Sequence, residues 1–102
     1  MNLIQLEKAE TSNKWGFTNY RLHQDFGAFH LKAGEKIPPG AHKHPEIIYV
    51  VKGTATFVSS DSGEKLTATD GNVVTIPANQ KKEIFNYGKE DVFAFWVNAA
   101  SL

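Results

Sequence analysis

Short runs of strand-forming residues, each stopped by a cluster of turn-forming residues, recur along the whole chain. Residues 73–76, Val-Val-Thr-Ile, form one such run, which ends at Pro77. β-Branched and aromatic residues favour strands, whereas Gly, Pro, Asn and Asp favour the turns between them. No apolar stripe with the helical period of about 3.6 residues is long enough to compete, and only residues 3–10 are ambiguous. Short strands separated by turns at such regular intervals predict an antiparallel sandwich or a small barrel. A barrel has the advantage that it leaves no strand edge exposed.

The expected strands follow directly from this alternation. They cover residues 14–22, 26–33, 42–52, 54–59, 64–68, 73–76, 82–87 and 92–98. Residues 34–40 are expected to form a loop, because two prolines and two glycines interrupt a ladder of strand hydrogen bonds. No linker, low-complexity tract or repeat of fixed period divides the sequence. Residues 1–102 are therefore expected to form a single domain.

Composition excludes several classes of function. The 11 basic and 11 acidic residues cancel, so no basic field favours nucleic acid as a partner. The chain has no cysteine, which excludes disulfides, thiolate zinc sites and cysteine nucleophiles. It has no signal-peptide pattern and no apolar segment of membrane-spanning length, so we expect a cytoplasmic protein with no membrane partner. It also has no glycine-rich phosphate-binding loop, and we expect no organic cofactor.

The segment from His42 to Glu46 carries the strongest chemical signal. Side chains of an extended strand alternate between faces, so His42, His44 and Glu46 share one face if the strand is regular. Pro45 lacks the backbone donor of the ladder and could break that regularity. Two imidazoles and a carboxylate suit Fe, Mn, Ni, Co or Zn, and they leave positions open for substrate or water. We therefore predict that these three residues are ligands of a divalent metal.

Two spaced motifs in the chain resemble those of the cupin family. The first cupin motif, G-x5-H-x-H-x3-E-x6-G, is similar to the segment Gly34-x5-Gly40-x-His42-x3-Glu46-x6-Gly53. The second, G-x5-P-x-G-x2-H-x3-N, is similar to Gly71-x5-Pro77-x-Asn79-x2-Lys82-x3-Asn86. Every spacing is kept in both. The resemblance implies an all-β, antiparallel jelly-roll barrel, often dimeric, which in many members holds a divalent metal through three His and one Glu.

The chain departs from the family pattern at two ligand positions. In the strict alignment Gly40 and Lys82 stand where the first and last His ligands are expected, which leaves His42 and Glu46 at ligand positions. A second alignment takes His42 and His44 as the His-x-His pair of the family, with adjusted spacing on both sides. The sequence leaves both alignments open. Both direct His42 and Glu46 inward, because a shift of two residues keeps the parity of a strand.

Lys82 is a further candidate for the chemistry of the site. An inward ammonium could pair with Glu46 or anchor an anionic substrate, whereas the plainer alternative is an exposed basic pair with Lys81. An inward ammonium would also repel a metal cation. We predict His44, Glu46 and Lys82 as the catalytic residues, in a pocket that is lined also by His42, Ile48 and Val50.

Three functions remain open at this point. The first is a barrel that binds a small polar or anionic metabolite, with the metal-dependent isomerase, lyase or dioxygenase chemistry that the resemblance implies. The second is a non-enzymatic binding or sensing module without metal, because two of the four ligand positions are changed. The third is a structural barrel that mainly forms a homodimer, because residues 93–96, Phe-Ala-Phe-Trp, are apolar on both strand faces. Aromatic residues such as Trp15 and Trp96 are assigned to the core or to an interface.

Overall fold

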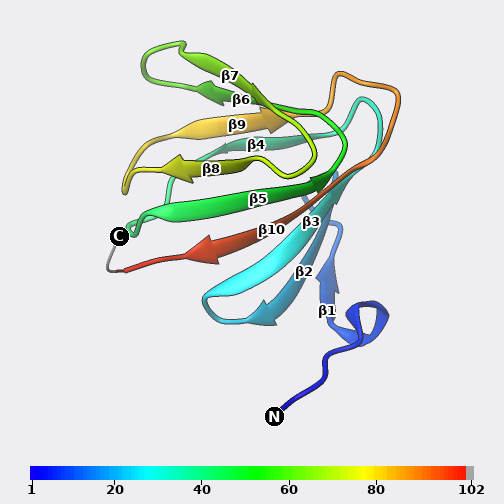
Figure 1. Cartoon of the computed structure of the whole chain (residues 1–102). Helices are drawn as coiled ribbons and strands as arrows, with labels where there is room; N and C mark the ends of the chain where they lie inside the picture. The colour runs from blue at the N-terminus through cyan, green and yellow to red at the C-terminus, as the bar shows by residue number, and fades with distance from the viewer. Residues whose placement is uncertain (101–102) are drawn as a thin grey trace.

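The computed structural model describes residues 1–100, and these residues form two antiparallel β-sheets that face each other (Figure 1). A short 3-10 turn comes first, followed by the strands. The elements are η1 (Leu6–Lys8), β1 (Glu10–Ser12), β2 (Thr18–His23), β3 (Phe26–Leu31), β4 (Lys36–Gly40), β5 (Glu46–Lys52), β6 (Ala55–Ser59), β7 (Lys65–Ala68), β8 (Val73–Ile76), β9 (Lys82–Phe85) and β10 (Val92–Asn98). The prediction of an all-β, antiparallel jelly-roll fold is confirmed.

The order of the strands explains how distant segments reach one site. The larger sheet has the order β1-β2-β3-β10-β5-β8, and the smaller sheet has the order β4-β9-β6-β7. Consecutive strands β4, β5 and β6 therefore alternate between the sheets, as do β7, β8 and β9. The first residues of β5 and β9 come from opposite sheets, and both point into the space between them.

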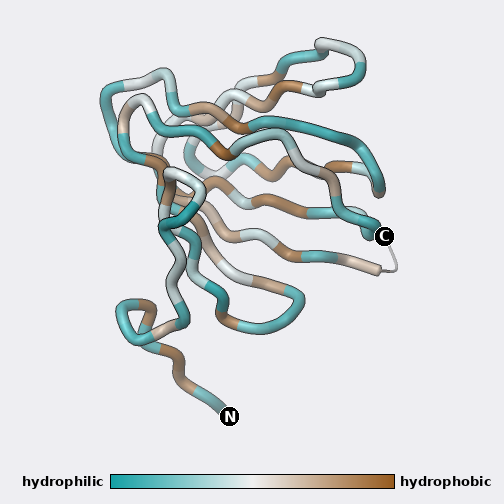
Figure 2. Tube along the Cα trace, turned by 180° about the vertical axis from the view of Figure 1, so that it is seen from behind, coloured by the Kyte–Doolittle hydropathy of each residue, from teal (hydrophilic) through white to brown (hydrophobic). Residues whose placement is uncertain are grey.

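The hydrophobic core lies between the two sheets, and the inward positions of the strands supply it. Figure 2 shows the brown hydrophobic segments along the strands, whereas the connecting loops are mostly teal. Ile48 and Val50 of β5 are buried, while Tyr49 and Val51 are exposed, which is the period-two alternation expected of a strand with one buried face. The core cluster consists of Phe29, Leu31, Ile48, Val50, Ala55, Phe57, Ala68, Val74, Ile76, Ile84, Val92 and Ala94.

Several boundaries differ from the sequence prediction, and proline explains two of the differences. The strand expected from residue 14 begins only at Thr18, after a turn. Residues 36–40 were expected to be a loop, but they form β4. This strand is at the edge of the smaller sheet, where missing proline donors are tolerated, and its register shifts between Ile37 and Gly40. The strand expected from residue 42 begins only at Glu46, after Pro45. The sequence also gave no signal for β1, which pairs with β2 through only three residues.

The last residue of the second motif, Asn86, has a structural role. Its side chain is buried, and its Nδ2 donates to the carbonyls of Leu31 (3.0 Å) and Glu90 (2.8 Å). Its Oδ1 accepts a hydrogen bond from the N–H of Gly88 at 3.0 Å. Asn86 thus ties β3 to the turn before β10. Within the described residues, no helix is long and apolar enough to cross a membrane.

Candidate functional site

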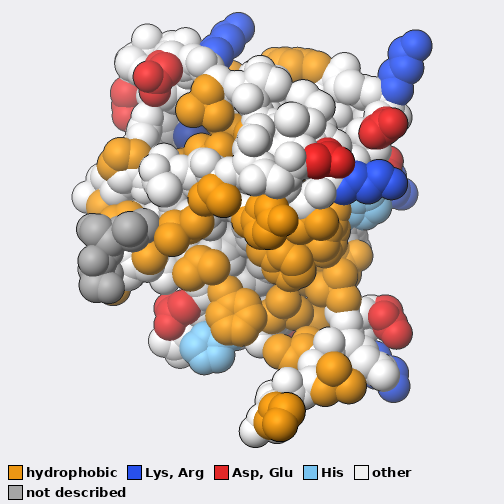
Figure 3. Space-filling view, in the orientation of Figure 1, with side chains coloured by type: hydrophobic (Ala, Val, Ile, Leu, Met, Phe, Trp, Pro, Cys, Tyr) orange, Lys and Arg blue, Asp and Glu red, His pale blue; other side chains and the backbone are white. Residues whose placement is uncertain are grey.

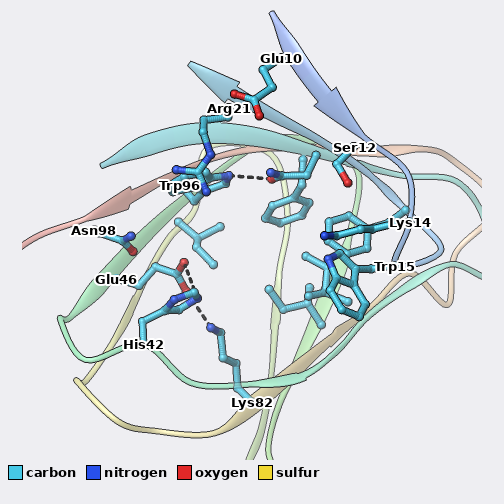
Figure 4. Close-up of a pocket in the computed structure, with 16 residues that line it drawn as sticks. Glu10, Ser12, Lys14, Trp15, Arg21, His42, Glu46, Lys82, Trp96 and Asn98 are labelled. Carbon is cyan, nitrogen blue, oxygen red and sulfur yellow. Dashed lines mark hydrogen bonds and ion pairs between the residues drawn. The ribbon is translucent and has the colours of Figure 1, made fainter. Parts of the chain in front are cut away.

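A cavity of about 480 Å³ lies between the two sheets (Figure 4). Its wall combines charged, polar and aromatic side chains from both sheets and from the N-terminal strands. The lining residues are Glu10, Ser12, Lys14, Trp15, Phe17, Asn19, Arg21, Phe29, Ile37, His42, Glu46, Ile48, Lys82, Ile84, Trp96 and Asn98. We call His42, Glu46, Lys82 and Asn98 the polar end, and Lys14, Trp15 and Phe17 the aromatic end. Figure 4 shows Lys14 and Trp15 across the cavity from Glu46 and Asn98.

A buried ion pair connects the two sheets at the polar end. Glu46 is the first residue of β5 and is 6% exposed, and Lys82 is the first residue of β9 and is 7% exposed. The Lys82 Nζ lies 2.9 Å from the Glu46 Oε1. Removing two charges from water costs several kcal/mol for each, so such a pair persists only when the charges compensate each other. The pair fixes both side chains at the wall of the cavity.

His42 joins this pair from the loop that precedes β5. Its Nε2 lies 3.5 Å from the Glu46 Oε2, and about half of its side chain is exposed. Its carbonyl accepts a hydrogen bond of 2.7 Å from the N–H of Asn79. Asn79 has a φ of 64°, in the left-handed region that asparagine tolerates better than most residues. The turn before β9 therefore holds the His42 loop and leads into Lys82.

The register of β4 and β9 shows how Lys82 relates to the missing histidine. Gly40 lies directly opposite Lys82 in this antiparallel pair. Residues that are directly opposite point to the same face of a sheet, so a side chain at position 40 would point the same way as Lys82. A Cβ at Gly40 would meet only the Pro38 carbonyl oxygen, at 3.9 Å. This arrangement fits the strict alignment, in which both positions belong to the ligand set.

The structure does not bring all the predicted site residues together. His42, Glu46, Ile48 and Lys82 line the cavity, as expected. His44 is exposed and is not part of the lining, because the chain from residue 42 to Pro45 is not a strand and the parity argument fails there. Val50 is fully buried in the core beyond the cavity. The assignment of His44 as a metal ligand and catalytic residue therefore has no geometric support.

The remaining donors do not fit a divalent metal. Within residues 1–100, no group of three or more His, Cys, Asp or Glu side chains could hold such an ion. His42 and Glu46 offer one imidazole and one carboxylate, and Lys82 already lies against that carboxylate. Two unit charges about 4 Å apart interact by about 4 kcal/mol near a protein surface, and a dication doubles the repulsion from the ammonium. The carboxylate that would have to bind a metal ion is thus already paired with the Lys82 ammonium.

Sequence reasoning missed the residues that close the cavity from the N-terminal side. Trp15, Phe17, Asn19 and Arg21 all line it. The sequence did place the first three on one face of a strand, but the aromatic residues were assigned to the core or to an interface. The alternation of Asn19 and Arg21 on β2 is the signal that could have identified part of this wall, whereas Trp15 and Phe17 lie in the turn before β2, where strand alternation does not apply.

Trp96 of β10 also lines the cavity. Its Nε1 donates to the Asn19 Oδ1 at 3.0 Å, which fixes the orientation of the indole ring. Gly27 lies opposite Trp96 in the β3–β10 pair, and a Cβ at Gly27 would collide with the ring and with the Tyr20 carbonyl oxygen. Glycine is therefore required for the ring to lie flat against β3.

Two buried oxygen atoms at the polar end have no hydrogen-bond partner within the described residues. They are the Glu46 Oε1 and the Asn98 Oδ1. The Lys82 Nζ lies 2.9 Å from the Glu46 Oε1, so the ion pair compensates the charge at this oxygen. Glu46 and Asn98 are directly opposite each other on β5 and β10. Both oxygens have almost no accessible surface, so the side chains around them shield them from the contents of the cavity.

Comparisons with known proteins agree with this architecture. Residues 27–98 match the profile of the family described as Cupin domain. This segment contains both motifs and all of the polar end. A comparison of the sequence with curated proteins finds no match.

Three solved structures illustrate the likeness of fold. The polyketide cyclase RemF from Streptomyces resistomycificus has a TM-score of 0.79 and 18% identity, over 96% of this chain and 78% of that one. A protein described as a predicted oxalate decarboxylase from Thermotoga maritima has a TM-score of 0.77 and 18% identity, over 96% and 100%. A Cupin 2 conserved barrel domain protein from Salinispora arenicola has a TM-score of 0.76 and 23% identity, over 98% and 91%. Identities this low show the fold alone.

Proposed function

This chain belongs to the cupin family, and on that premise we propose that it binds a small polar or anionic metabolite in its cavity without a metal ion. The observation that supports this proposal is the buried Glu46–Lys82 ion pair in the cavity wall. Buried charges in a concave pocket are characteristic of functional sites. The cavity volume of about 480 Å³ lies in the range of small-molecule sites.

The charges around the cavity favour an anionic or polar ligand. Lys14, Arg21 and Lys82 contribute cations, and Glu10 and Glu46 contribute carboxylates. Glu10 lies opposite Arg21 on neighbouring strands, and Glu46 is paired with Lys82, so Lys14 remains as the excess cation. The excess is small, which suits a ligand with one negative group on a larger uncharged body.

The polar end also has the groups needed to move a proton. The Glu46 carboxylate can accept a proton from a bound molecule, and the imidazole of His42, at 3.5 Å from the carboxylate, can relay it to solvent. The Lys82 ammonium can stabilise negative charge that develops on the ligand. These roles support isomerase or lyase chemistry of the proton-transfer type. The fold neighbours described as a polyketide cyclase and a predicted oxalate decarboxylase are compatible with such chemistry.

Tryptophan fluorescence tests the binding proposal, because both tryptophans of the chain line the cavity. The chelator-treated protein would be titrated with benzoate and succinate, each compared with its neutral amide. We expect the carboxylates to change the fluorescence and to bind more tightly than the amides. We also expect Lys82→Met to weaken carboxylate binding about tenfold, with the exposed neighbour variant Lys81→Met as control. No fluorescence change with any of these compounds would contradict the proposal.

A second measurement separates an enzyme from a binding or sensing module. Exchange of the C3 hydrogens of 2-oxobutyrate with deuterated water would be followed by NMR with the wild-type protein and with Glu46→Gln. Acceleration that Glu46→Gln abolishes would support proton-transfer chemistry. Binding of 2-oxobutyrate without acceleration would favour the non-enzymatic alternative.

The outer face of the larger sheet favours an additional role in self-association. Val73, Tyr49 and Phe95 lie directly opposite one another on β8, β5 and β10, and they are 59%, 46% and 38% exposed. Val51 and Val97 extend this exposed apolar row. Figure 3 shows hydrophobic side chains gathered across this face. Contiguous exposed apolar surface of this kind marks interaction sites, and an identical face on a second copy would match it in character.

We therefore propose that the chain forms a homodimer through this face. Size-exclusion chromatography with light scattering would measure its mass. We expect a dimer that Phe95→Glu converts to a monomer, whereas Leu66→Glu, at an exposed apolar position on β7 of the other sheet, leaves the mass unchanged. A wild-type monomer at micromolar concentration would contradict the homodimer.

A further inference from the structure

Lys82 places a buried primary amine in the wall of the cavity, and such an amine can do more than carry a charge. We propose that Lys82 forms a protonated imine with a carbonyl compound such as a 2-oxo acid, with Glu46 as its counter-ion and as the base of the reaction. The inference rests on the proposed function, since it names the class of ligand and a covalent step in the same cavity. It goes beyond the electrostatic role of the Lys82 ammonium, which requires no bond to the ligand.

The amine of Lys82 lies where a ligand in the cavity can reach it. Lys82 is the first residue of β9, its side chain is 8% exposed, and it belongs to the lining of the cavity. Figure 4 shows the side chain extending towards Glu46 and His42, with its nitrogen at the polar end. A carbonyl carbon bound at this end can therefore approach the nitrogen.

The groups beside Lys82 can take up the proton that its ammonium must lose before the nitrogen attacks a carbonyl carbon. The Glu46 Oε1 lies 2.9 Å from the Lys82 Nζ, so the proton can pass directly to the carboxylate. This transfer is strongly unfavourable in water, but here it converts two buried charges into two neutral groups, and burial disfavours charge. His42, half-exposed and 3.5 Å from the Glu46 Oε2, connects the carboxyl group to solvent.

Imine formation preserves the balance of charge at the polar end. The lone pair of the Lys82 nitrogen bonds to the carbonyl carbon, and the carbonyl oxygen leaves as water with two hydrogens of the original ammonium. The nitrogen keeps one hydrogen, a double bond to carbon and the positive charge. The buried Glu46 carboxylate thus has a cation beside it both before and after the reaction, and the product does not leave it uncompensated.

The imine also gives the polar end a route to proton transfer at carbon. A protonated imine withdraws electrons from the adjacent carbon, so the hydrogens on that carbon become more acidic. In the imine of a 2-oxo acid, C3 is two bonds from the Lys82 nitrogen, which the Glu46 carboxylate contacts. Glu46 can take the C3 proton while the C–H electron pair forms an enamine and the nitrogen becomes neutral. Return of a proton from solvent to C3 restores the imine and exchanges the hydrogen.

Reductive trapping tests the covalent step. Chelator-treated protein would be incubated with 2-oxobutyrate and cyanoborohydride, which reduces an imine to a stable secondary amine, and modified lysines would be located by peptide mass spectrometry. At about pH 6 exposed lysine amines are almost entirely protonated and react slowly. We expect modification of Lys82 to exceed that of its exposed neighbour Lys81 by about tenfold. 2-Hydroxybutyrate, which has the carboxylate but no carbonyl, should give no adduct.

Lys82→Arg separates the covalent role from the electrostatic one. A guanidinium keeps a cation beside Glu46 and can bind an anion, but it forms no imine. We expect Lys82→Arg to abolish both the trapped adduct at position 82 and the C3 exchange of 2-oxobutyrate, and to keep the binding of benzoate. Lys81→Met is the matched control and should change none of these. Circular dichroism would verify that Lys82→Arg folds, and the peptide map of the wild-type protein decides if it does not.

Two outcomes would overturn the inference and leave the proposed function standing. The first is that 2-oxobutyrate changes the tryptophan fluorescence while trapping modifies Lys82 no more than Lys81. The second is that Lys82→Arg retains the accelerated C3 exchange, which would assign Lys82 a purely electrostatic role. If benzoate, succinate and 2-oxobutyrate all fail to bind, the proposed function fails and the inference fails with it.

Discussion

The two ends of the cavity are built in different ways. The polar end consists of residues at strand termini in both sheets, and its Glu46 and Lys82 side chains are almost fully buried. The aromatic end consists of the connection between β1 and β2, where Trp15 is 61% exposed and Lys14 Nζ lies 5.2 Å from the centre of its ring. The first end is held by a network of opposite charges, and the second by a loop on the surface.

This difference suggests that the two ends of the cavity have different roles in ligand binding. Charged groups must be held in place to recognise or to transfer a proton, because a small displacement removes their effect. Aromatic groups on a loop can instead adjust to ligands of different outline. We infer that the polar end fixes how a ligand is oriented, and that the aromatic end adjusts to the size of the ligand. Changes at the polar end should therefore affect stability and binding together, and changes at the aromatic end should affect binding alone.

The largest expected effect is on stability, from Lys82→Met. It leaves the Glu46 carboxylate buried without its cation, and breaking a buried pair in this way costs about 3–5 kcal/mol. Urea denaturation would measure the loss, with Lys81→Met, at the exposed neighbouring position, expected to stay within about 0.5 kcal/mol. Adding Glu46→Leu to Lys82→Met should recover most of the loss, because the unpaired charge is then removed. Equal stability of the two lysine variants would show that the pair is not buried as described.

The contact between Gly27 and Trp96 should give an intermediate effect on stability. Gly27→Ala introduces a Cβ that collides with the Trp96 ring and the Tyr20 carbonyl, and overpacking of this kind costs about 1–3 kcal/mol. Gly40→Ala is the matched control, because the space beside Gly40 is open and its loss should be small. Denaturation would be followed by tryptophan fluorescence, which also reports a displaced Trp96. If Gly27→Ala were as stable as Gly40→Ala, the indole ring would not lie against β3.

The smallest effect on stability is expected at the aromatic end. Trp15→Ala removes a mostly exposed side chain, so the free energy of unfolding should change by no more than about 0.5 kcal/mol. Binding of benzoate should weaken severalfold, because the Trp15 ring lines the cavity. Calorimetry measures the affinity, with Tyr87→Ala, at another exposed aromatic position, as the control. Unchanged affinity in Trp15→Ala would place the ligand entirely at the polar end.

The sequence predicted much of the fold, because the physics of strands and turns is local. Each of the eight expected runs corresponds to an observed strand that lies within or close to its expected limits, and Val73–Ile76 and Val92–Asn98 show no shift. At two places the effect of proline on the strand boundaries was predicted wrongly from the sequence. Pro38 and Pro39 are accepted in β4 because the strand is at a sheet edge, which only the topology reveals. Pro45 delays the start of β5 and turns His44 away.

The residues of the site were harder to predict from the sequence than the strands, because they depend on which strands lie side by side in the fold. The motif spacing put Glu46 and Lys82 at related positions, and the structure has them in contact. Asn98 and Trp96 gave no local signal, since their roles arise from the β5–β10 register. The N-terminal wall depends on β1 and β2 folding over the cavity, and no short motif encodes this arrangement.

A cobalt titration tests most directly the claim that the Glu46–Lys82 pair takes the place of a metal site. Chelator-treated wild-type protein would be compared with the double variant Gly40→His/Lys82→His, which places histidines at the two changed positions beside His42 and Glu46. We predict that the wild-type protein gives no visible absorption band of bound Co²⁺, and that the double variant binds one equivalent. A stoichiometric band in the wild-type protein that is lost in Glu46→Gln would contradict the account.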